Sequence, residues 1–327
     1  IKGEQDRVVV YCVASNFKPA TEDSDRGDVA LALENVSLFE DVVRLCCEAG
    51  VNRVILTSSM AAVRGPAQVP MNGQYFTAHE WNTVSTLRAD SFASCYQYSK
   101  TRSEQRAVEI VHAANTATAA AAAAAAAAAI AAANSAAAST AASTSTSTSA
   151  STPTSALAPP HFTELVSLCP SMIFGPVRDV SQLGYSCDLV SAWLGGTRKV
   201  ESRLMVDVRD AALAHLRAAM LPSVGLPSVG DDDEGVQGGY RHKHRRYIIS
   251  QEKRITASET MSMLEGAGAG VGVGVGVGGM HCDELFDGGA VRIGDKEVEG
   301  GMGELGVVCR PAEETFRDMA QSLQRVR

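Results

Sequence analysis

The sequence predicts an α/β fold organised around a doubly wound parallel sheet, and three observations support this. Short runs of apolar, largely β-branched residues recur along the chain, at 8–14, 53–57, 165–169 and 246–250. Amphipathic helical patterns lie between them, at 34–49, 96–112 and 208–220. Strands that are apolar on both sides and alternate with helices are typical of a parallel sheet with helices on both faces.

Composition narrows the class of protein. The 327 residues include 29 Lys and Arg against 37 Asp and Glu, and this acidic balance argues against a general nucleic-acid binder. An alanine-rich tract is the only apolar stretch near membrane-spanning length, and alanine is too weakly hydrophobic for a span, so we expect no transmembrane segment. Eight cysteines without Cys-x-x-Cys spacing predict free thiols in a reducing, cytoplasmic setting and no metal site.

The first three elements form a predicted βαβ unit. Val8–Ala14 is expected to be a strand buried on both faces, and Arg53–Thr57 a second strand parallel to it. Between them, the helix at 34–49 ends at Gly50, because glycine accepts the left-handed conformation that commonly closes a helix. The expected buried stripe of this helix consists of Leu38, Val42, Leu45, Cys46 and Ala49.

The later elements repeat this alternation. The helix at 96–112 is followed, beyond a low-complexity segment, by a strand at Leu165–Cys169 that Pro170 closes. A short strand at Leu204–Val206 comes next, followed by a helix that runs to about Met220, and a last strand lies at 246–250. The polar group at the start of that helix is expected to be a structural cap with ion pairs, not a metal or acid–base site; it comprises Asp207, Arg209, Asp210 and His215.

Three segments have low complexity. Residues 117–149 are almost all Ala, Ser and Thr, and because the tract has no distinct apolar face we predict a disordered or frayed surface insertion. An acidic run at 231–234 and a basic run at Arg241–Arg246 are expected to be a solvated loop. Residues 266–279 alternate Gly with Val or Ala. A G-x-G-x-x-G match there lacks a flanking strand and helix, so it predicts no phosphate site; it is formed by Gly274, Gly276 and Gly279.

The chemistry is predicted at Tyr96 and Lys100. A spacing of four residues places the phenol and the ammonium group on one helix face. Ser58 and Ser59 directly follow the strand at 53–57, so they lie at the carboxyl edge of a parallel sheet, where ligands bind in open α/β folds. We therefore expect the phenol, the ammonium group and a serine hydroxyl to meet at one site.

Such a site suits hydride transfer to or from a carbonyl. A tyrosine exchanges protons poorly near neutral pH, and we expect the Lys100 cation to lower the Tyr96 pKa. A serine hydroxyl can hydrogen-bond the carbonyl oxygen, which becomes an alkoxide when hydride adds and then takes a proton from Tyr96. The alternative is a surface tyrosine beside an incidental lysine and a polar strand end.

At these residues the chain resembles the extended short-chain dehydrogenase/reductase family, and within it the branch of dihydroflavonol 4-reductase and cinnamoyl-CoA reductase. The matching stretches occur in the family's order and cover nearly all of the chain outside the low-complexity segments. They are VYCVASNF (10–17), the Asn35-Val36 pair, AGVNRVILTSSMAAV (49–63), EWN (80–82), YQYSKTRSE (96–104), LVSLCPSMIFGP (165–176), VDVRDAALAH (206–215), RYIIS (246–250) and LGVVCRPAEETFRD (305–318).

The resemblance implies a role for each matching residue. Ser59 would orient the carbonyl, Tyr96 would be the general acid and base, and Lys100 would lower the Tyr96 pKa and bind the nicotinamide ribose. The implied cofactor contacts are Val13, Ala14, Ser15, Thr57, Ser58, Tyr96, Lys100, Pro170, Ser171, Met172 and Ile173. The implied substrate contacts are Ser59, Met60, Tyr96, Phe174 and the segment 178–205. This chemistry requires no metal.

The chain departs from the family pattern at several positions. Cys12 and Asn16 stand where the family usually has His and Pro, and Arg102 and Ser103 where it has Leu and Ala. Asp41 stands where a helical Asn is frequent, which argues against a proton relay there. The family's opening strand and G-x-x-G-x-x-G turn, which holds the cofactor pyrophosphate, has no counterpart before Val8. We therefore expect roughly 60 or more N-terminal residues to lie outside this sequence.

These observations predict four regions. They are an incomplete Rossmann-like NAD(P)-binding core at 1–116, a low-complexity insert at 117–158, a core strand and nicotinamide loop at 159–177, and a mainly substrate-binding region at 178–327. The last region includes core elements near 204–220 and 246–250 and inserts at 221–245 and 266–279.

The expected function is NAD(P)H-dependent reduction of an aldehyde or ketone to an alcohol, with NADP as cofactor and NAD as the alternative. Two other functions stay open: an NAD-dependent epimerase, dehydratase or 3β-hydroxysteroid dehydrogenase, and a non-catalytic cofactor sensor or scaffold. The expected partner is a small-molecule carbonyl substrate, without nucleic acid or membrane. The resemblance is also compatible with a homodimer.

Overall fold

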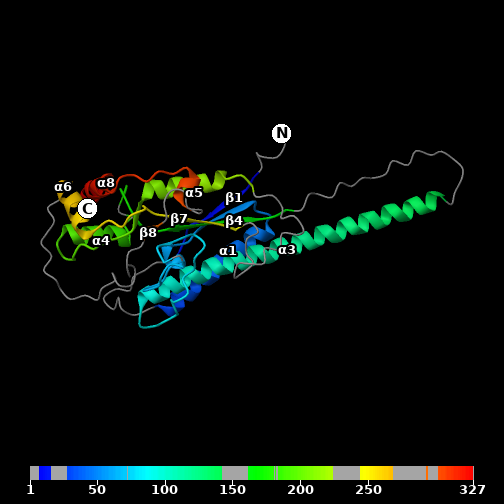
Figure 1. Cartoon of the computed structure of the whole chain (residues 1–327), viewed down its shortest axis with the longest axis horizontal. Coiled ribbons are helices and arrows are strands. Elements are labelled where there is room, and N and C mark those ends of the chain that lie inside the picture. Colours follow the sequence, from blue (N-terminus) through cyan, green and yellow to red (C-terminus); the bar gives the residue numbers. More distant parts are fainter. Residues whose placement is uncertain are drawn as a thin grey trace.

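The computed structural model describes residues 7–15, 28–71, 73–141, 161–179, 181, 183–223, 244–267, 292–293 and 301–326, the side chains of 136–141 and 292–293 excepted. Figure 1 shows its elements along the chain. They are β1 (Val9–Cys12), α1 (Val29–Glu48), β2 (Arg53–Thr57), α2 (Met60–Val63), β3 (Tyr75–Phe76), α3 (Phe92–Ala141), β4 (Glu164–Pro170), β5 (Met172–Phe174), α4 (Tyr185–Leu194), β6 (Met205–Asp207), α5 (Val208–Met220), β7 (His244–Ile249), α6 (Ala257–Gly266), β8 (Arg292–Ile293), the 3₁₀ helix η2 (Met302–Leu305) and α8 (Ala312–Val326).

A parallel sheet lies at the centre of the molecule. Its strands are ordered β1-β2-β4-β7, and every neighbouring pair is parallel. Two small sheets of two strands each lie outside it. One pairs β3 with β8 over two residues, and the other pairs β5 with β6 over three. The predicted α/β fold is confirmed, as are the strands predicted at 53–57, 165–169 and 246–250, with shifts of one or two residues at their ends.

Helices cover both faces of this sheet, as Figure 1 shows. Val54 and Leu56 of β2 pack in one cluster with α1 and α3, whereas Ile55 packs in another with α5. Successive side chains of a strand point to opposite faces, so a continuous apolar run serves both layers. Because helices cover both faces of the sheet, we expect a ligand to bind at the carboxyl ends of the strands, where ligands bind in open α/β folds.

Helix α1 starts earlier than predicted and buries a different face. Asp28 caps it by accepting a hydrogen bond from the Leu31 amide (2.8 Å), and Gly50 follows with φ of +68°, as expected for the stop. The predicted stripe is wrong for Leu38, Leu45 and Ala49, which are exposed, and right for Cys46, which is buried. Periodicity could not choose between two adjacent apolar stripes. The residues that are buried are Ala32, Asn35, Val36, Phe39, Val43 and Cys46.

Strand β1 is shorter than predicted and is not buried on both faces. Val8, Tyr11 and Val13 are exposed, and Cys12 is buried. Among the residues that the structure describes, β1 pairs with β2 alone and is therefore an edge strand. An apolar run predicts burial on both faces only when neighbouring strands and helices enclose it, and β1 lacks that enclosure in the described part of the chain.

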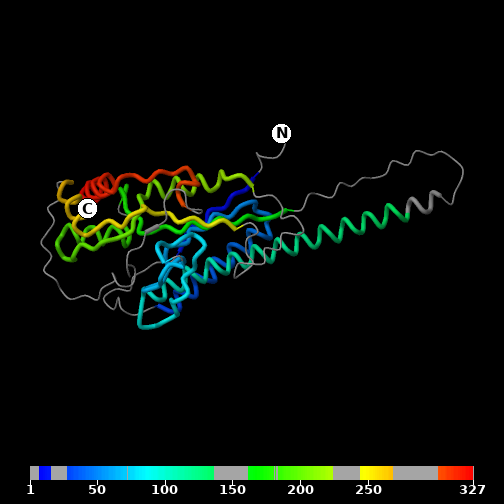
Figure 2. The backbone as a smooth tube through the Cα atoms, in the orientation of Figure 1, coloured from blue at the N-terminus to red at the C-terminus, as the bar shows by residue number. Residues whose placement is uncertain are grey.

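Helix α3 continues far beyond the predicted boundary of 112. It runs without interruption through the alanine tract to Ala141 and projects away from the sheet (Figures 1 and 2). Most side chains of 117–135 are exposed, as expected of a surface insertion, but the prediction that the tract is disordered is wrong for 117–141, which is helical. Alanine has the highest intrinsic helix propensity, and the packed turns before it remove the cost of nucleation. Residues 142–160 lie outside the described part.

The length of α3 bears on the predicted absence of a membrane span. Phe92–Ser135 is long and apolar enough to cross a membrane by length and composition, and none of its most apolar window is buried. Alanine supplies that apolar character, and Ala107, Val108 and Val111 of the same helix pack in the protein core. The absence of a transmembrane segment therefore stays a prediction.

The basic run at 241–246 is not a solvated loop throughout. His244–Arg246 belong to β7, and Arg246 is buried with its guanidinium paired to Glu104 of α3. The loop prediction is wrong for these three residues. A run of basic residues predicts exposure, and the sequence does not show that the buried Glu104 carboxylate pairs with Arg246. The insert predicted at 221–245 also overlaps β7 by two residues. The runs at 231–234 and 241–243, the Gly274–Gly279 repeat and Cys282 lie outside the described residues.

A second apolar core lies in the C-terminal region. Phe174, Trp193 and Phe316 form its centre, with ring centroids 5.2 to 6.5 Å apart. These rings come from β5, α4 and α8, and Leu264 of α6 joins them. This part of the chain is the predicted substrate-binding region, whose boundaries and role stay predictions.

Candidate active site

The turn between β2 and α2 presents the two predicted serines. Ser59 caps α2 by accepting a hydrogen bond from the Ala61 amide (3.1 Å), which keeps its side chain at the carboxyl end of β2. From α3, the Tyr96 phenol donates a hydrogen bond to Ser59 Oγ (3.3 Å). Two of the three predicted catalytic side chains thus meet, although they lie 37 residues apart in sequence.

Lys100 lies one helical turn after Tyr96 and is only 8% exposed. Its Nζ lies 5.4 Å from the centroid of the Phe39 ring of α1. Burial lowers the pKa of Lys100 to about 8, although Cys12, Cys169 and Glu104 nearby act in the opposite direction. A group with this pKa is still mainly a cation at neutral pH.

The expected lowering of the Tyr96 pKa is not found. Burial raises the pKa of this phenol, and the hydrogen bond with Ser59 offsets only part of that effect. The prediction considered the neighbouring cation and neglected desolvation, which disfavours the phenolate. Tyr96 is therefore a protonated phenol at neutral pH, the form that can donate a proton.

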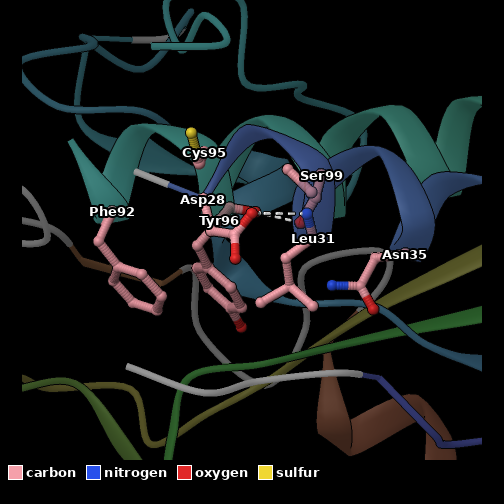
Figure 3. Close-up of a pocket in the computed structure, with 8 residues that line it drawn as sticks. Asp28, Leu31, Asn35, Phe92, Cys95, Tyr96 and Ser99 are labelled. Atoms are coloured by element: carbon pink, nitrogen blue, oxygen red, sulfur yellow. Dashed lines mark hydrogen bonds between the residues drawn. The ribbon is translucent and has the colours of Figure 1, made fainter. Parts of the chain in front are cut away.

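A shallow pocket opens beside Tyr96 between α1 and α3 (Figure 3). The Phe92 and Tyr96 rings stack with centroids 6.5 Å apart, and the Asn35 side chain points the same way from its helix as the Tyr96 ring (Figure 3). The pocket is lined by Asp28, Leu31, Ala32, Asn35, Phe92, Cys95, Tyr96 and Ser99.

The predicted cofactor contacts gather at one edge of the sheet. Val13–Ser15 follow β1, Thr57 ends β2 with Ser58 directly after it, and Pro170–Ile173 pass from β4 into β5. Because β1, β2 and β4 are parallel neighbours, their carboxyl ends meet at this edge. Val13 and Ala14 are exposed there, which leaves the backbone of this turn accessible to a ligand.

Several hydroxyls of this set already have protein partners. Thr57 Oγ1 lies 2.7 Å from His215 Nε2, and Ser58 Oγ donates to Glu104 Oε2 (2.5 Å). Ser15 Oγ lies 3.4 Å from Asn35 Oδ1, to which it donates. A cofactor contact by Thr57 or Ser58 is therefore expected through the backbone, and these roles stay predictions.

The predicted substrate contacts differ in accessibility. Tyr96 lines the pocket and holds Ser59, whereas Met60 is buried in a cluster with Val63 and Phe76. Phe174 is 1% exposed and belongs to the C-terminal core, so its burial gives no support to a substrate contact. The resemblance suggested that Phe174 contacts the substrate, but its place at the end of β5 does not distinguish a residue that lines a pocket from a core residue.

Two buried residues near the site escaped the sequence reasoning. Asn35 is buried and lines the pocket, whereas the sequence indicated only that the Asn35-Val36 pair matches the family. Asp41, the position considered for a relay, is exposed and pairs with Arg44 (3.2 Å). Glu104 is fully buried one turn after Lys100. An acidic residue four positions after the predicted catalytic lysine, on the buried face of its helix, was the signal that could have revealed it.

Asp207, Arg209 and Asp210 form a structural cap with ion pairs at the start of α5, as predicted, whereas His215 lies against Thr57 of β2. Asp207 accepts hydrogen bonds from the Arg209 amide (2.8 Å) and from the Thr315 hydroxyl (2.7 Å). Arg209 also pairs with Asp318 (2.8 Å) of α8, which ties α5 to the C-terminal region. Within the described ranges, no three His, Cys, Asp or Glu side chains are grouped to hold a metal ion.

Comparison with known proteins supports the fold. No protein-family profile and no curated protein matches the sequence. The structure matches yeast methylglyoxal/isovaleraldehyde reductase Gre2 complexed with NADPH, with a TM-score of 0.60, 21% identity, and coverage of 97% of this chain and 76% of that one. Gre2 from Candida albicans in complex with NADPH matches with a TM-score of 0.58, 17% identity, and coverage of 98% and 77%.

An enzyme with different chemistry matches equally well. UDP-glucose 4-epimerase from Bifidobacterium longum, in complex with NAD⁺ and UDP, gives a TM-score of 0.58, 13% identity, and coverage of 97% of this chain and 76% of that one. The chain shares the fold of these proteins. At such low identities a common fold does not choose between reductase and epimerase, so the choice depends on the site itself.

Proposed function

We propose that this protein is an NAD(P)H-dependent oxidoreductase of the extended short-chain type that reduces an aldehyde or ketone to an alcohol. The observation that carries the proposal is the Tyr96 phenol hydrogen-bonded to Ser59 at the carboxyl edge of a parallel sheet, with Lys100 buried one turn away. A phenol and a second hydroxyl in hydrogen-bond contact, with a buried cation one turn further along the same helix as the phenol, suit addition of hydride to a carbonyl.

The residues at the sheet edge fit a nicotinamide cofactor. The accessible Val13–Ser15 turn, the backbone at Thr57 and Ser58, and the Pro170–Ile173 segment would hold its nicotinamide half, and Lys100 would face the ribose. The cofactor would supply the hydride. Both Gre2 structures contain NADPH and the epimerase contains NAD⁺, so we propose NADPH as the preferred cofactor and NADH as the alternative.

The chain's own residues handle the carbonyl oxygen. Ser59 Oγ and the Tyr96 phenol would both hydrogen-bond this oxygen, which orients the carbonyl carbon toward the incoming hydride. As the hydride adds, the oxygen becomes an alkoxide and takes the phenolic proton, leaving a phenolate at Tyr96. The Lys100 ammonium then offsets the new negative charge. The raised pKa of Tyr96 keeps the phenol protonated before hydride transfer, so that it has a proton to donate.

The first test measures cofactor binding and activity separately. NADPH and NADH are titrated into the chain by fluorescence, and reduction of a panel of aldehydes and ketones is followed by NADPH absorbance. In the Tyr96→Phe variant we expect unchanged NADPH binding and a fall in kcat of about 10²- to 10⁴-fold, the usual contribution of a positioned general acid. Tyr98→Phe, two residues away on α3, removes the same atom outside the site and should retain full activity.

The outcomes separate the three readings of the sequence. Loss of carbonyl reduction in Tyr96→Phe but not in Tyr98→Phe supports the reductase. Binding of NAD⁺ together with conversion of UDP-glucose, and no carbonyl reduction, favours an epimerase. Binding of NADPH or NADH without turnover of any aldehyde or ketone favours a sensor or scaffold and contradicts the proposal.

A further inference from the structure

A buried carboxylate lies directly behind the candidate site. Glu104 of α3 is fully buried and occupies the helical position one turn beyond Lys100. Its Oε2 accepts a hydrogen bond from Ser58 Oγ (2.5 Å), and its two oxygens accept from Arg246 Nε (2.7 Å) and Nη2 (3.1 Å). A charged carboxylate is costly to bury, and this one is retained with both oxygens occupied.

Arg246 compensates the charge and ties the carboxylate to the surrounding chain. Burial would raise the Glu104 pKa, but the Arg246 guanidinium, with His244 and Ser58, outweighs it, so the pKa is lowered and Glu104 is ionised. Arg246 also donates to the carbonyls of Ala78 (3.0 Å) and Glu80, and its guanidinium carbon lies 3.9 Å from the Trp81 ring centroid. Glu104 is therefore a rigid anchor.

The other end of this contact is the turn that carries Ser59. Ser58 Oγ is bound to Glu104, and the Ser58 amide donates to the Leu168 carbonyl of β4 (2.8 Å). The next residue is Ser59, which receives the Tyr96 hydrogen bond. A serine held at both its side chain and its backbone transmits its position to the residue that follows it.

Helix α2, which Ser59 caps, is also held by the 78–82 loop, to which Arg246 binds. Asn82, next to Trp81, donates through its side chain to the Ala61 carbonyl (2.8 Å), and its amide donates to the Ala62 carbonyl (2.9 Å). Glu104 therefore acts on α2 by two routes, directly through Ser58 and through Arg246 and the 78–82 loop.

We propose that Glu104 is a positioning residue that holds Ser58 so that the neighbouring Ser59 hydroxyl meets the Tyr96 phenol. This inference rests on the proposed function for its kinetic consequence, but the geometry concerns the Ser59–Tyr96 contact itself. Glu104 touches neither hydroxyl of that pair. Its effect would pass through Ser58, whose own side chain is directed to the carboxylate and not to the pocket.

The test compares three substitutions of buried hydroxyls. Ser58→Ala removes the contact with Glu104, Ser58→Thr keeps a hydroxyl at that position, and Ser103→Ala is the matched control. Ser103 adjoins Glu104 on α3, and its buried hydroxyl has no hydrogen-bond partner among the described residues. Thermal unfolding of each variant sets an assay temperature at which all four proteins are folded.

Two measurements distinguish positioning from a general structural role. We expect Ser58→Ala to lower kcat for carbonyl reduction roughly 10- to 100-fold with little change in KM for NADPH, because displacement of a catalytic group affects the reacting geometry. Ser58→Thr should recover most of kcat, and Ser103→Ala should resemble the wild type. A raised KM for NADPH in Ser58→Ala would instead indicate direct cofactor binding by Ser58 and would overturn the proposal.

The second measurement needs no enzymatic activity. The Tyr96 ionisation is obtained as the 295 nm absorbance titration of each protein minus that of its Tyr96→Phe counterpart. Because contact with Ser59 lowers the Tyr96 pKa, loss of that contact in Ser58→Ala should raise the pKa, and Ser103→Ala should leave it unchanged. An identical Tyr96 titration in wild type and Ser58→Ala contradicts the proposal. If the wild type reduces no carbonyl, the proposed function fails while this titration still decides the inference.

Discussion

The two ends of α3 are parts of one helix that are stabilised in different ways. The packed segment, 92–111, lies against α1 and the sheet, and Ala107, Val108 and Val111 are buried in the core beneath β2. The alanine segment, 117–135, extends from the body, and its one large apolar side chain, Ile130, is 62% exposed. Both are helical, but only the packed segment carries Tyr96 and Lys100.

The difference shows that helix formation and helix packing are separate properties. In the packed segment the helix is specified by an apolar stripe that the core covers, and propensity plays a minor part. In the alanine segment intrinsic propensity sustains a helix that a preceding turn has already nucleated. Stability and chemistry should therefore reside in the first segment and be insensitive to the second.

The largest effect is expected in the pH dependence of the packed segment's chemistry. The Lys100 pKa of about 8 predicts that the rate of carbonyl reduction is constant below this pH and falls about tenfold per pH unit above it, as the ammonium loses its proton. Steady-state kinetics between pH 6 and 10 measure the profile. A proline at Ala126, in the alanine segment, should leave the profile unchanged, and a flat wild-type profile would exclude a role for the Lys100 charge.

Replacement of Lys100 should stabilise the fold. Because burial depresses its pKa from 10.5 to about 8, the unfolded chain binds a proton more readily, and stability due to Lys100 rises as pH increases from about 8 to 10.5. Lys100→Met should therefore raise the free energy of unfolding at pH 7 by up to about 3 kcal/mol.

Urea unfolding at pH 7 and pH 10 measures this gain, which should shrink at the higher pH. Lys253→Met at an exposed site is the control and should show no such pH-dependent gain. Destabilisation by Lys100→Met at pH 7 would mean that its contact with the Phe39 ring outweighs the cost of burying the ammonium.

Truncation of an apolar side chain should lower the free energy of unfolding in the packed segment and not in the alanine segment. Val111→Ala removes two buried methylene equivalents and should cost about 2 kcal/mol of unfolding free energy. Ile130→Ala removes more apolar atoms from the exposed segment and should change that free energy by less than about 0.5 kcal/mol. Chemical denaturation of both variants gives the comparison; equal losses would show that the alanine segment packs against something in solution.

The smallest effect on the core is expected from breaking the alanine segment itself. Ala126→Pro should reduce the helical circular dichroism signal at 222 nm, because proline removes a hydrogen bond and clashes with the preceding turn. The thermal midpoint of the core should not move. Ala107→Pro, at a buried position of the packed segment, should prevent folding, so a shared loss of cooperative unfolding in both variants would remove the distinction between the segments.

The candidate site was predictable as far as residue types and strand ends could place it. The spacing of Tyr96 and Lys100 and the position of Ser59 after the RVILT strand predicted one common site, and the structure shows the contact between Tyr96 and Ser59. The Tyr96 pKa was not predictable in this way, because its direction depends on desolvation by the folded chain. Glu104 and Asn35 were also missed, since their partners come from distant segments.

For the fold, the order of apolar runs and helical stripes was sufficient to indicate a parallel sheet covered on both faces, because those periods reflect the geometry of each element. The stripe of α1 that is buried, the exposure of β1 and the burial of Arg246 against Glu104 were outside the reach of periodicity. Each depends on which neighbour occupies the adjoining space. The sequence pattern of a segment shows which of its faces are apolar enough to be buried. The tertiary structure determines which of these faces is buried, because burial requires a neighbouring element to cover the face.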